Sequence, residues 1–132
     1  CLLIELPFHN KIIGLLDIIS EIKSAGYLPI IAHPERYTYF QDDYSLVDEL
    51  RRERVLFQCN YTSIIGRYGD SAEKLLKYML KHRYVDYLGT DLHRVDRTTL
   101  IDNWEKIDKL FNKVAGKDYY EKIKRNCDFL VS

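Results

Sequence analysis

Four short apolar runs, spaced at nearly regular intervals, constrain the fold of this chain more than any other feature. They begin about 27 to 30 residues apart, which is close to the length of a strand–helix–strand unit. Each run is continuous rather than alternating, as is typical of parallel strands covered on both faces. The runs occupy residues 2–6, 28–32, 55–59 and 85–88. They predict a parallel α/β sheet.

The segments between and after these runs have the periodicity of amphipathic helices. Gly26 ends the first segment and Gly116 separates the last two. Four strands cannot close an eight-stranded parallel barrel. We therefore expect either an open sheet or further residues before Cys1, where the chain begins inside an apolar run. The expected helices cover residues 12–22, 46–50, 72–80, 100–111 and 119–131.

Length and charge limit the class of protein. The chain has 132 residues, the size of one ordinary domain, so we treat 1–132 as a single domain. Lys plus Arg and Asp plus Glu each total 20, which leaves no net field to attract nucleic acid or an anionic membrane. No apolar run approaches the roughly 20 residues that cross a bilayer. The three cysteines are far apart in the sequence and suggest no disulfide framework. We expect a cytoplasmic protein.

Polar residues follow the predicted strands at the points where the strands end. In parallel α/β folds, ligands bind at the carboxyl ends of the strands, where consecutive loops share one crevice. Four consecutive units therefore present coordinating groups at one rim. These residues are Glu5, His33, Gln58, Asn60, Asp91 and His93.

His33, Asp91 and His93 are the strongest metal-ligand candidates. Pro34 favours an extended backbone at His33, which would hold the imidazole rigidly at the rim. A lone histidine is more often a hydrogen-bonded loop residue, but the company of Asp91 and His93 favours a ligand. Residues two apart in an extended chain point the same way and can share adjacent cations. Asp and His together suit Zn, Mn or Fe better than Ca or Mg.

The remaining rim residues are open to two interpretations each. Glu5 is either a further carboxylate ligand or a strand-end glutamate paired with a lysine. Arg36 either clamps a phosphate or forms a surface ion pair with Glu35 or Asp42. Of Arg94 and Arg97, we expect at least one to face the site. Gln58 and Asn60 either contact groups behind the ligands or tie loops together. An aromatic wall could be formed by the tyrosines of the rim loops, which are Tyr37, Tyr39, Tyr61 and Tyr68.

Several other chemistries are excluded by the sequence. A cysteine-based phosphatase needs an arginine six positions after the nucleophile, so that loop amides and the guanidinium surround one phosphate. That position holds Pro7 after Cys1 and Ile65 after Cys59, and it lies beyond the end after Cys127. The chain also has no nucleophile elbow, phosphate-binding P-loop or dinucleotide-binding glycine motif.

Several motifs resemble those of the polymerase and histidinol phosphatase (PHP) superfamily. They are I-A-H-P-E-R-Y at 31–37, F-Q-C-N at 57–60, the Tyr-Gly turn at 68–69, L-G-T-D-L-H at 88–93 and the opening L-L-I-E-L. Within the superfamily they look most like the bacterial tyrosine-protein phosphatases encoded with capsular and exopolysaccharide genes. The resemblance implies the C-terminal portion of a distorted (β/α)₇ barrel. It also implies up to three divalent metal ions, most often manganese, with iron or zinc as alternatives.

The resemblance also implies an activity and roles for individual residues. The family hydrolyses phosphotyrosine through a metal-activated hydroxide, notably on the tyrosine kinase that controls polysaccharide export. Glu5, His33, Asp91 and His93 match metal-ligand positions, and Arg36 matches a phosphate-contacting arginine. Arg97 matches the family's downstream arginine only loosely, with one fewer intervening residue.

The family's N-terminal ligands, including a His-x-His pair, have no counterpart in these 132 residues, so we expect this chain to represent only the later part of such a barrel. Two alternatives to the protein phosphatase therefore remain. One is a catalytically silent fragment or interaction module, and the other is a phosphatase for small monoesters such as histidinol phosphate. An open barrel edge at 2–6 would also favour self-association.

Overall fold

The computed structural model describes the backbone of residues 1–90, 98 and 100–131, with side chains described as far as residue 127. Four parallel strands form one sheet in sequence order. The central strands are in register, with Ile31 beside Ile4 on one side and Phe57 on the other. The predicted parallel α/β sheet is thus confirmed. The strands are β1 (Leu2–Ile4), β2 (Pro29–Ala32), β3 (Leu56–Asn60) and β4 (Tyr87–Gly89).

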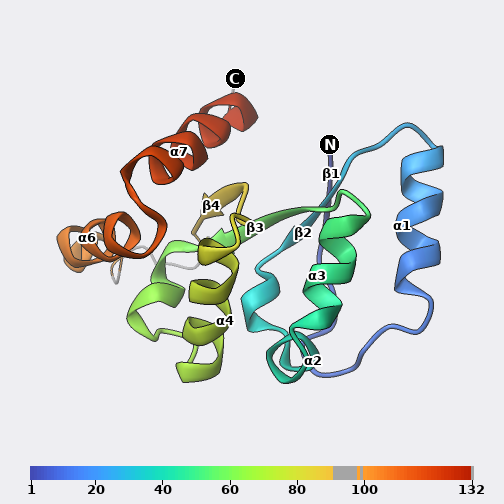
Figure 1. The fold of residues 1–132 in the computed structure, drawn as a ribbon, viewed down its shortest axis with the longest axis horizontal. Coiled ribbons are helices and arrows are strands. Elements are labelled where there is room, and N and C mark those ends of the chain that lie inside the picture. Colours follow the sequence, from blue (N-terminus) through green and yellow to red (C-terminus); the bar gives the residue numbers. More distant parts are fainter. Residues whose placement is uncertain (91–97, 99, 132) are drawn as a thin grey trace.

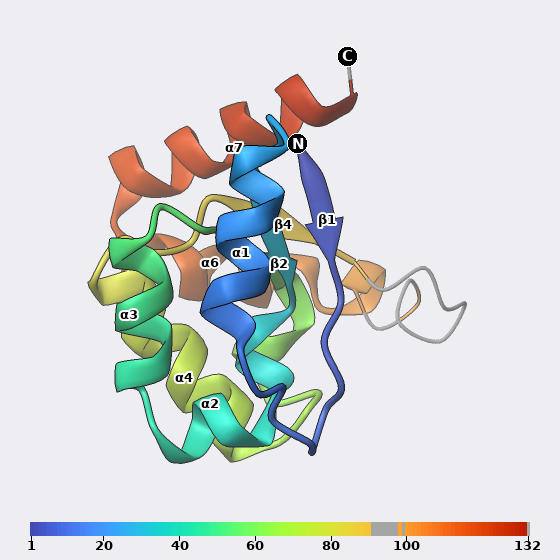
Figure 2. The same ribbon diagram turned by 90° about the vertical axis from the view of Figure 1, so that its right-hand side faces the viewer.

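Helices connect the strands and follow the last one, as the periodicity predicts. Figures 1 and 2 show α1, α3 and α4 on one face of the sheet, with α7 crossing beyond β4. Two short 3₁₀ helices, η1 and η2, come directly after β2 and β3. The helices are α1 (Leu15–Ser24), η1 (Pro34–Arg36), α2 (Thr38–Asp42), α3 (Ser45–Arg52), η2 (Tyr61–Ile65), α4 (Asp70–Lys81), α6 (Trp104–Ala115) and α7 (Lys117–Val131).

The two faces of the sheet differ in how well they are covered. Side chains alternate between the faces along each strand, and Ile31, Phe57 and Cys59 on the helix-covered face are fully buried. On the other face, Leu3 of β1 is 56% exposed and Gln58 of β3 is partly exposed. The expectation that the strands are covered on both faces is therefore wrong for β1, because no described element packs over Leu3.

Helix α7 holds β4 in place through its side chains. The Tyr119 hydroxyl donates to the Val85 carbonyl oxygen (2.7 Å) and accepts the Val85 N–H (2.8 Å). The Cys127 sulfur is 3.3 Å from both the amide nitrogen and the carbonyl oxygen of Leu88. The last helix therefore fixes the fourth strand, whose carboxyl end reaches the rim beside Asn60 through the pairing of Asn60 with Gly89.

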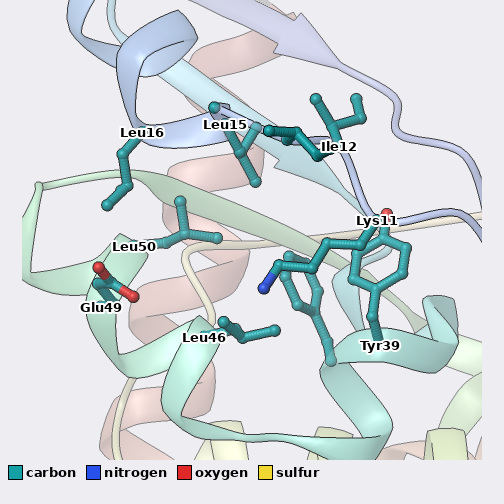
Figure 3. Close-up of a pocket in the computed structure, with 11 residues that line it drawn as sticks. Lys11, Ile12, Leu15, Leu16, Tyr39, Leu46, Glu49 and Leu50 are labelled. Atoms are coloured by element: carbon teal, nitrogen blue, oxygen red, sulfur yellow. The ribbon is translucent and has the colours of Figure 1, made fainter.

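A pocket of about 390 Å³ lies between α1 and α3 on the outer, helical side. In Figure 3, Ile12 and Leu15 face Leu46 and Leu50 across it, and Lys11 reaches over it from the loop before α1. The start of α1 is partly exposed: Leu16 in its first turn is 38% exposed, and Ile13 just before the helix is 97% exposed. Within the described part of the chain, no helix combines the length and apolar character needed to cross a bilayer.

Candidate functional site

The carboxyl ends of β1, β2 and β3 meet at one edge of the sheet and bring Glu5 and His33 together. The His33 Nε2 lies 3.9 Å from Glu5 Oε1. The histidine side chain is only 9% exposed, whereas the glutamate side chain is 74% exposed. The rim therefore presents one nitrogen and one oxygen donor side by side, with the nitrogen donor the more firmly held.

The backbone at His33 is left-handed, with φ 38° and ψ 55°. This differs from the extended backbone that Pro34 was expected to impose, and such a conformation costs on the order of 1 kcal/mol or more for a non-glycine residue. The contacts of His33 explain the difference. Its N–H donates to the Gln58 carbonyl (2.6 Å), which continues the ladder to β3, while its own carbonyl accepts the Arg36 N–H (3.0 Å). The chain must therefore turn at His33 itself.

Aromatic rings hold the His33 imidazole in place. The Phe8 ring stacks on it with centroids 5.4 Å apart, and the buried Tyr37 ring meets it edge-on at 5.3 Å. The Tyr37 hydroxyl accepts the Leu6 N–H (2.9 Å), and burial raises the pKa of Tyr37. This hydroxyl thus ties the segment after β1, which carries Glu5 and Phe8, to the segment after β2.

Glu35 lies directly behind this rim and is fully buried. Its Oε2 accepts the Asn60 N–H (2.8 Å) and the Ser63 hydroxyl (2.7 Å). Burial raises the pKa of Glu35, and the hydrogen bonds from Asn60 and Ser63 oppose that rise. Sequence reasoning considered Glu35 only as an ion-pair partner for Arg36. The only sequence signal for its true place was its position within the His-Pro-Glu-Arg motif.

Cys59 is buried next to Glu35. Burial, and then the neighbouring Glu35 carboxylate, raise the pKa of the Cys59 thiol well above its usual range. A thiol in that environment stays protonated and does not act as a nucleophile. The structure therefore agrees with the absence of a cysteine-phosphatase motif in the sequence.

Arg36 contacts two aromatic rings at the edge of the site. Its guanidinium carbon is 4.7 Å from the Phe8 ring centroid and 3.9 Å from that of Tyr68. Of the four tyrosines expected to form an aromatic wall, only Tyr68 contacts Arg36 in this way. The other three pack elsewhere: Tyr37 beneath His33, Tyr39 against Tyr37 and Phe40, and Tyr61 against Trp104 and Phe111. The second ring that contacts Arg36 belongs to Phe8, which sequence reasoning did not single out.

Gln58 and Asn60 occupy different places although both belong to β3. A Cβ at position 89 would overlap the Gln58 amide, so that amide lies directly over Gly89 of β4. Asn60 is buried, and its Nδ2 has no hydrogen-bond partner within the described ranges. A buried donor of this kind is normally satisfied by protein or water. Whether either amide contacts groups behind a metal stays a prediction.

The metal-ligand set remains partly a prediction. Asp91, His93, Arg94 and Arg97 lie outside the described residues, and among residues that are described no group of three potential ligands is present. The donors that the structure does place, Glu5 Oε1 and His33 Nε2, are a carboxylate and an imidazole, which suit Zn, Mn or Fe. These two donors fit a divalent metal ion but do not complete a site, so an ion held here would need further ligands.

The architecture places the chain in a known structural class. It resembles the solved structures described as YwqE from Bacillus subtilis and CpsB from Streptococcus pneumoniae, "unique metal-dependent tyrosine phosphatases", with a TM-score of 0.82 and 22% identity. The match covers 96% of this chain and 51% of the solved chain. The shared feature is therefore the fold of one half of such a protein.

The chain belongs to the capsular polysaccharide synthesis family CpsB/CapC, whose family model matches residues 1–130. It is 30% identical over 122 residues to a Staphylococcus aureus protein named "Putative tyrosine-protein phosphatase CapC", covering 92% of this chain and 46% of the relative. It is 26% identical over 94 residues to "Tyrosine-protein phosphatase YwqE" of Bacillus subtilis, covering 71% and 37%. The chain thus spans less than half of the length of these curated relatives.

Proposed function

We propose that this chain forms one half of the active site of a metal-dependent phosphatase that removes phosphate from phosphotyrosine. The observation that carries the proposal is the pairing of Glu5 Oε1 with His33 Nε2 at 3.9 Å, next to Arg36 and the two rings that contact it. A carboxylate, an imidazole and a guanidinium lie together at the edge where α/β folds bind ligands. The relatives named as tyrosine phosphatases support the same assignment.

Each residue of the site has a defined task in this proposal. Glu5 and His33 hold the metal, and Asp91 and His93 are proposed to complete its ligand set. A bound divalent ion lowers the pKa of water and neutralises charge on the phosphate oxygens. Arg36 orients the phosphate through the parallel N–H donors of its guanidinium, and Arg97 is proposed to assist. Glu35 holds the turn that carries His33 against β3 through Asn60 and Ser63.

The finer assignments extend this proposal. Manganese is the proposed metal, in a cluster of up to three ions in the intact protein. The proposed substrate is a phosphotyrosine protein of capsule or exopolysaccharide synthesis, most simply the tyrosine kinase of that system, and the proposed location is the cytoplasm. The family's link to capsular polysaccharide synthesis supports this substrate class.

Turnover under controlled metal supply tests the proposal. The full-length natural protein that contains this chain should hydrolyse p-nitrophenyl phosphate and a phosphotyrosine peptide when Mn²⁺ is present. Activity should disappear on chelation and return on adding Mn²⁺. Activity that a chelator leaves unchanged would refute the proposal. Faster turnover of histidinol phosphate than of the phosphotyrosine peptide would instead support the small-monoester alternative.

The second candidate is a catalytically silent interaction module that associates through β1. The exposed Leu3 favours it, together with the fact that β1 pairs only with β2 among the described strands. An uncovered strand edge of this kind is a template for pairing with another chain. Metal stoichiometry separates the two candidates, because two or three tightly bound ions per chain support the enzyme and none or one supports the module. Light scattering of the isolated chain tests the association, and a monodisperse monomer would refute it.

A further inference from the structure

Two rings from distant parts of the chain lie against the Arg36 side chain, with their centroids 4.7 Å and 3.9 Å from its guanidinium carbon. Phe8 belongs to the segment after β1, and Tyr68 to the turn between η2 and α4. The N–H donors of a guanidinium lie in its plane. A phosphate that pairs with these in-plane donors therefore binds at the edge of the guanidinium, beside the two rings. Any group esterified to that phosphate then lies close to Phe8 or Tyr68.

Phe8 contacts both of the groups that would meet a substrate. Its ring stacks on the His33 imidazole, with an interplanar angle of 14°, and also lies over Arg36. The Phe8 carbonyl accepts the Thr38 N–H (3.0 Å) and the Thr38 hydroxyl (3.1 Å). The backbone at Phe8 is therefore fixed relative to the turn that carries both His33 and Arg36.

Both rings keep surface that a ligand could cover. Phe8 is 39% exposed although it touches His33 and Arg36, and Tyr68 is only partly buried. A second guanidinium, that of Arg67, lies 5.8 Å from the Tyr68 ring centroid. The surroundings of Tyr68 are thus aromatic and positively charged, which suits an anion that carries an apolar planar group.

We infer that Phe8 and Tyr68 form a specificity pocket for the aryl group of a phosphate monoester held by Arg36. The pocket selects aryl phosphates over alkyl phosphates, because an aromatic ring gains offset or edge-to-face contacts that an alkyl group lacks. This inference rests on the proposed function, since it assumes that Arg36 binds the phosphate. It adds that two residues outside the metal and phosphate sites choose the leaving group.

A simpler role for the rings makes a different prediction. If Phe8 and Tyr68 only supported the Arg36 side chain, then replacing them would weaken every phosphate ligand to the same degree. If they contact the ester group, the loss falls on aryl ligands alone. The discriminating quantity is therefore the ratio of two affinities, measured in the same variant.

Binding of two non-hydrolysable phosphonates provides the test, without any need for turnover. In calorimetric titrations of the full-length protein with Mn²⁺, phenylphosphonate should bind about tenfold more tightly than methylphosphonate, which corresponds to about 1.4 kcal/mol. Tyr68→Leu and Phe8→Leu should reduce this ratio toward one and change methylphosphonate affinity by less than about threefold. Tyr68→Phe should keep the ratio, because it keeps the ring.

Tyr27→Leu is the matched control, since Tyr27 is an exposed tyrosine before β2, at the opposite end of the sheet. It should leave both affinities unchanged. Equal affinities in the unmodified protein, equal losses for both ligands in the variants, or no binding of either ligand would overturn the inference. A ratio near one in the unmodified protein, with Mn²⁺-dependent hydrolysis intact, refutes only the pocket. A preserved ratio in a protein that never hydrolyses phosphate refutes only the proposed function.

Discussion

The rim at the carboxyl ends of the strands and the pocket between α1 and α3 are built differently. The pocket has a volume of about 390 Å³ and mainly apolar walls (Figure 3). The rim brings together a carboxylate, an imidazole and a guanidinium, each held by segments that are distant in sequence. Cavity volume was therefore not the criterion for the candidate site in this chain. The rim is the proposed site because its polar groups converge on fixed supports.

Tyr39 connects the two regions. Its ring lines the pocket, while its hydroxyl donates to the Pro7 carbonyl oxygen (2.6 Å) in the segment that leads to Phe8. The same residue thus contributes dispersion contacts on one side and a directional hydrogen bond on the other. Substitutions in either region should show which kind of contact matters for activity and which matters only for stability.

The largest contrast is expected between His33→Ala at the rim and Leu16→Ala at the pocket. If His33 is the metal ligand proposed above, its loss should lower Mn²⁺ affinity and turnover by more than about 100-fold, beyond the range found for groups that only orient ligands. Leu16→Ala should leave both unchanged. Calorimetric Mn²⁺ titration and phosphatase assays measure the two quantities. A His33→Ala variant with unchanged metal affinity would remove His33 from the site.

Among these substitutions, Glu35→Ala should lower the free energy of unfolding the most. It leaves the buried Asn60 N–H and the Ser63 hydroxyl without their acceptor, at a cost of about 3 kcal/mol. Urea denaturation followed by circular dichroism measures the change. Glu49→Ala, at the margin of the pocket, is the matched control and should change stability by less than about 0.5 kcal/mol. Equal effects of the two substitutions would contradict the structural role of Glu35.

Tyr39→Phe should cost about 1 kcal/mol by removing the hydrogen bond to Pro7. It should also change the response to alkaline pH, because burial raises the pKa of Tyr39 to about 12. A neutral phenol favoured by the fold stabilises the protein fully below the unfolded pKa near 10, and that stability is lost as pH rises toward 12. The variant should therefore lose less stability than the unmodified protein between pH 10 and 12. Parallel denaturation curves across that range would contradict this assignment.

The smallest effect is expected at Ile13, the most exposed residue near the pocket. Ile13→Ser should change the free energy of unfolding by less than about 0.5 kcal/mol, because the side chain is already 97% exposed. Turnover should also be unchanged. A clear fall in activity would show that the pocket region contributes to function and would weaken the contrast with the rim.

Much of the fold could be predicted from hydrophobic periodicity. The four apolar runs became the four strands, and the helical segments became helices with breaks near Gly26 and Gly116, both of which have positive φ. Periodicity records which face of an element is buried, so it works where burial decides the structure. Periodicity did not reveal that Leu3 is exposed, because the coverage of Leu3 depends on what packs over the face of the sheet opposite the helices.

The site was predictable only in part. The strand-end rule correctly placed Glu5 beside His33. It could not place Phe8 or Glu35. A phenylalanine after a strand carries no signal of its own, and the motif around Glu35 does not reveal that its carboxylate is buried behind the rim. The local effect of Pro34 on His33 was overridden by a hydrogen bond to Gln58, which is distant in sequence. The roles of Asp91, His93 and Arg97 stay predictions.

Strand β1 is joined to the rest of the sheet along one side, and the links from Tyr37, Thr38 and Tyr39 hold the residues that follow it. In the language of native-state hydrogen exchange, β1 and residues 5–8 should form a unit that opens at lower free energy than β2, β3 and β4. That unit carries Glu5 and Phe8. The proposed carboxylate ligand Glu5 and the proposed pocket residue Phe8 would therefore lose their positions in the same opening event. Strand β2, which precedes His33, would stay protected from exchange.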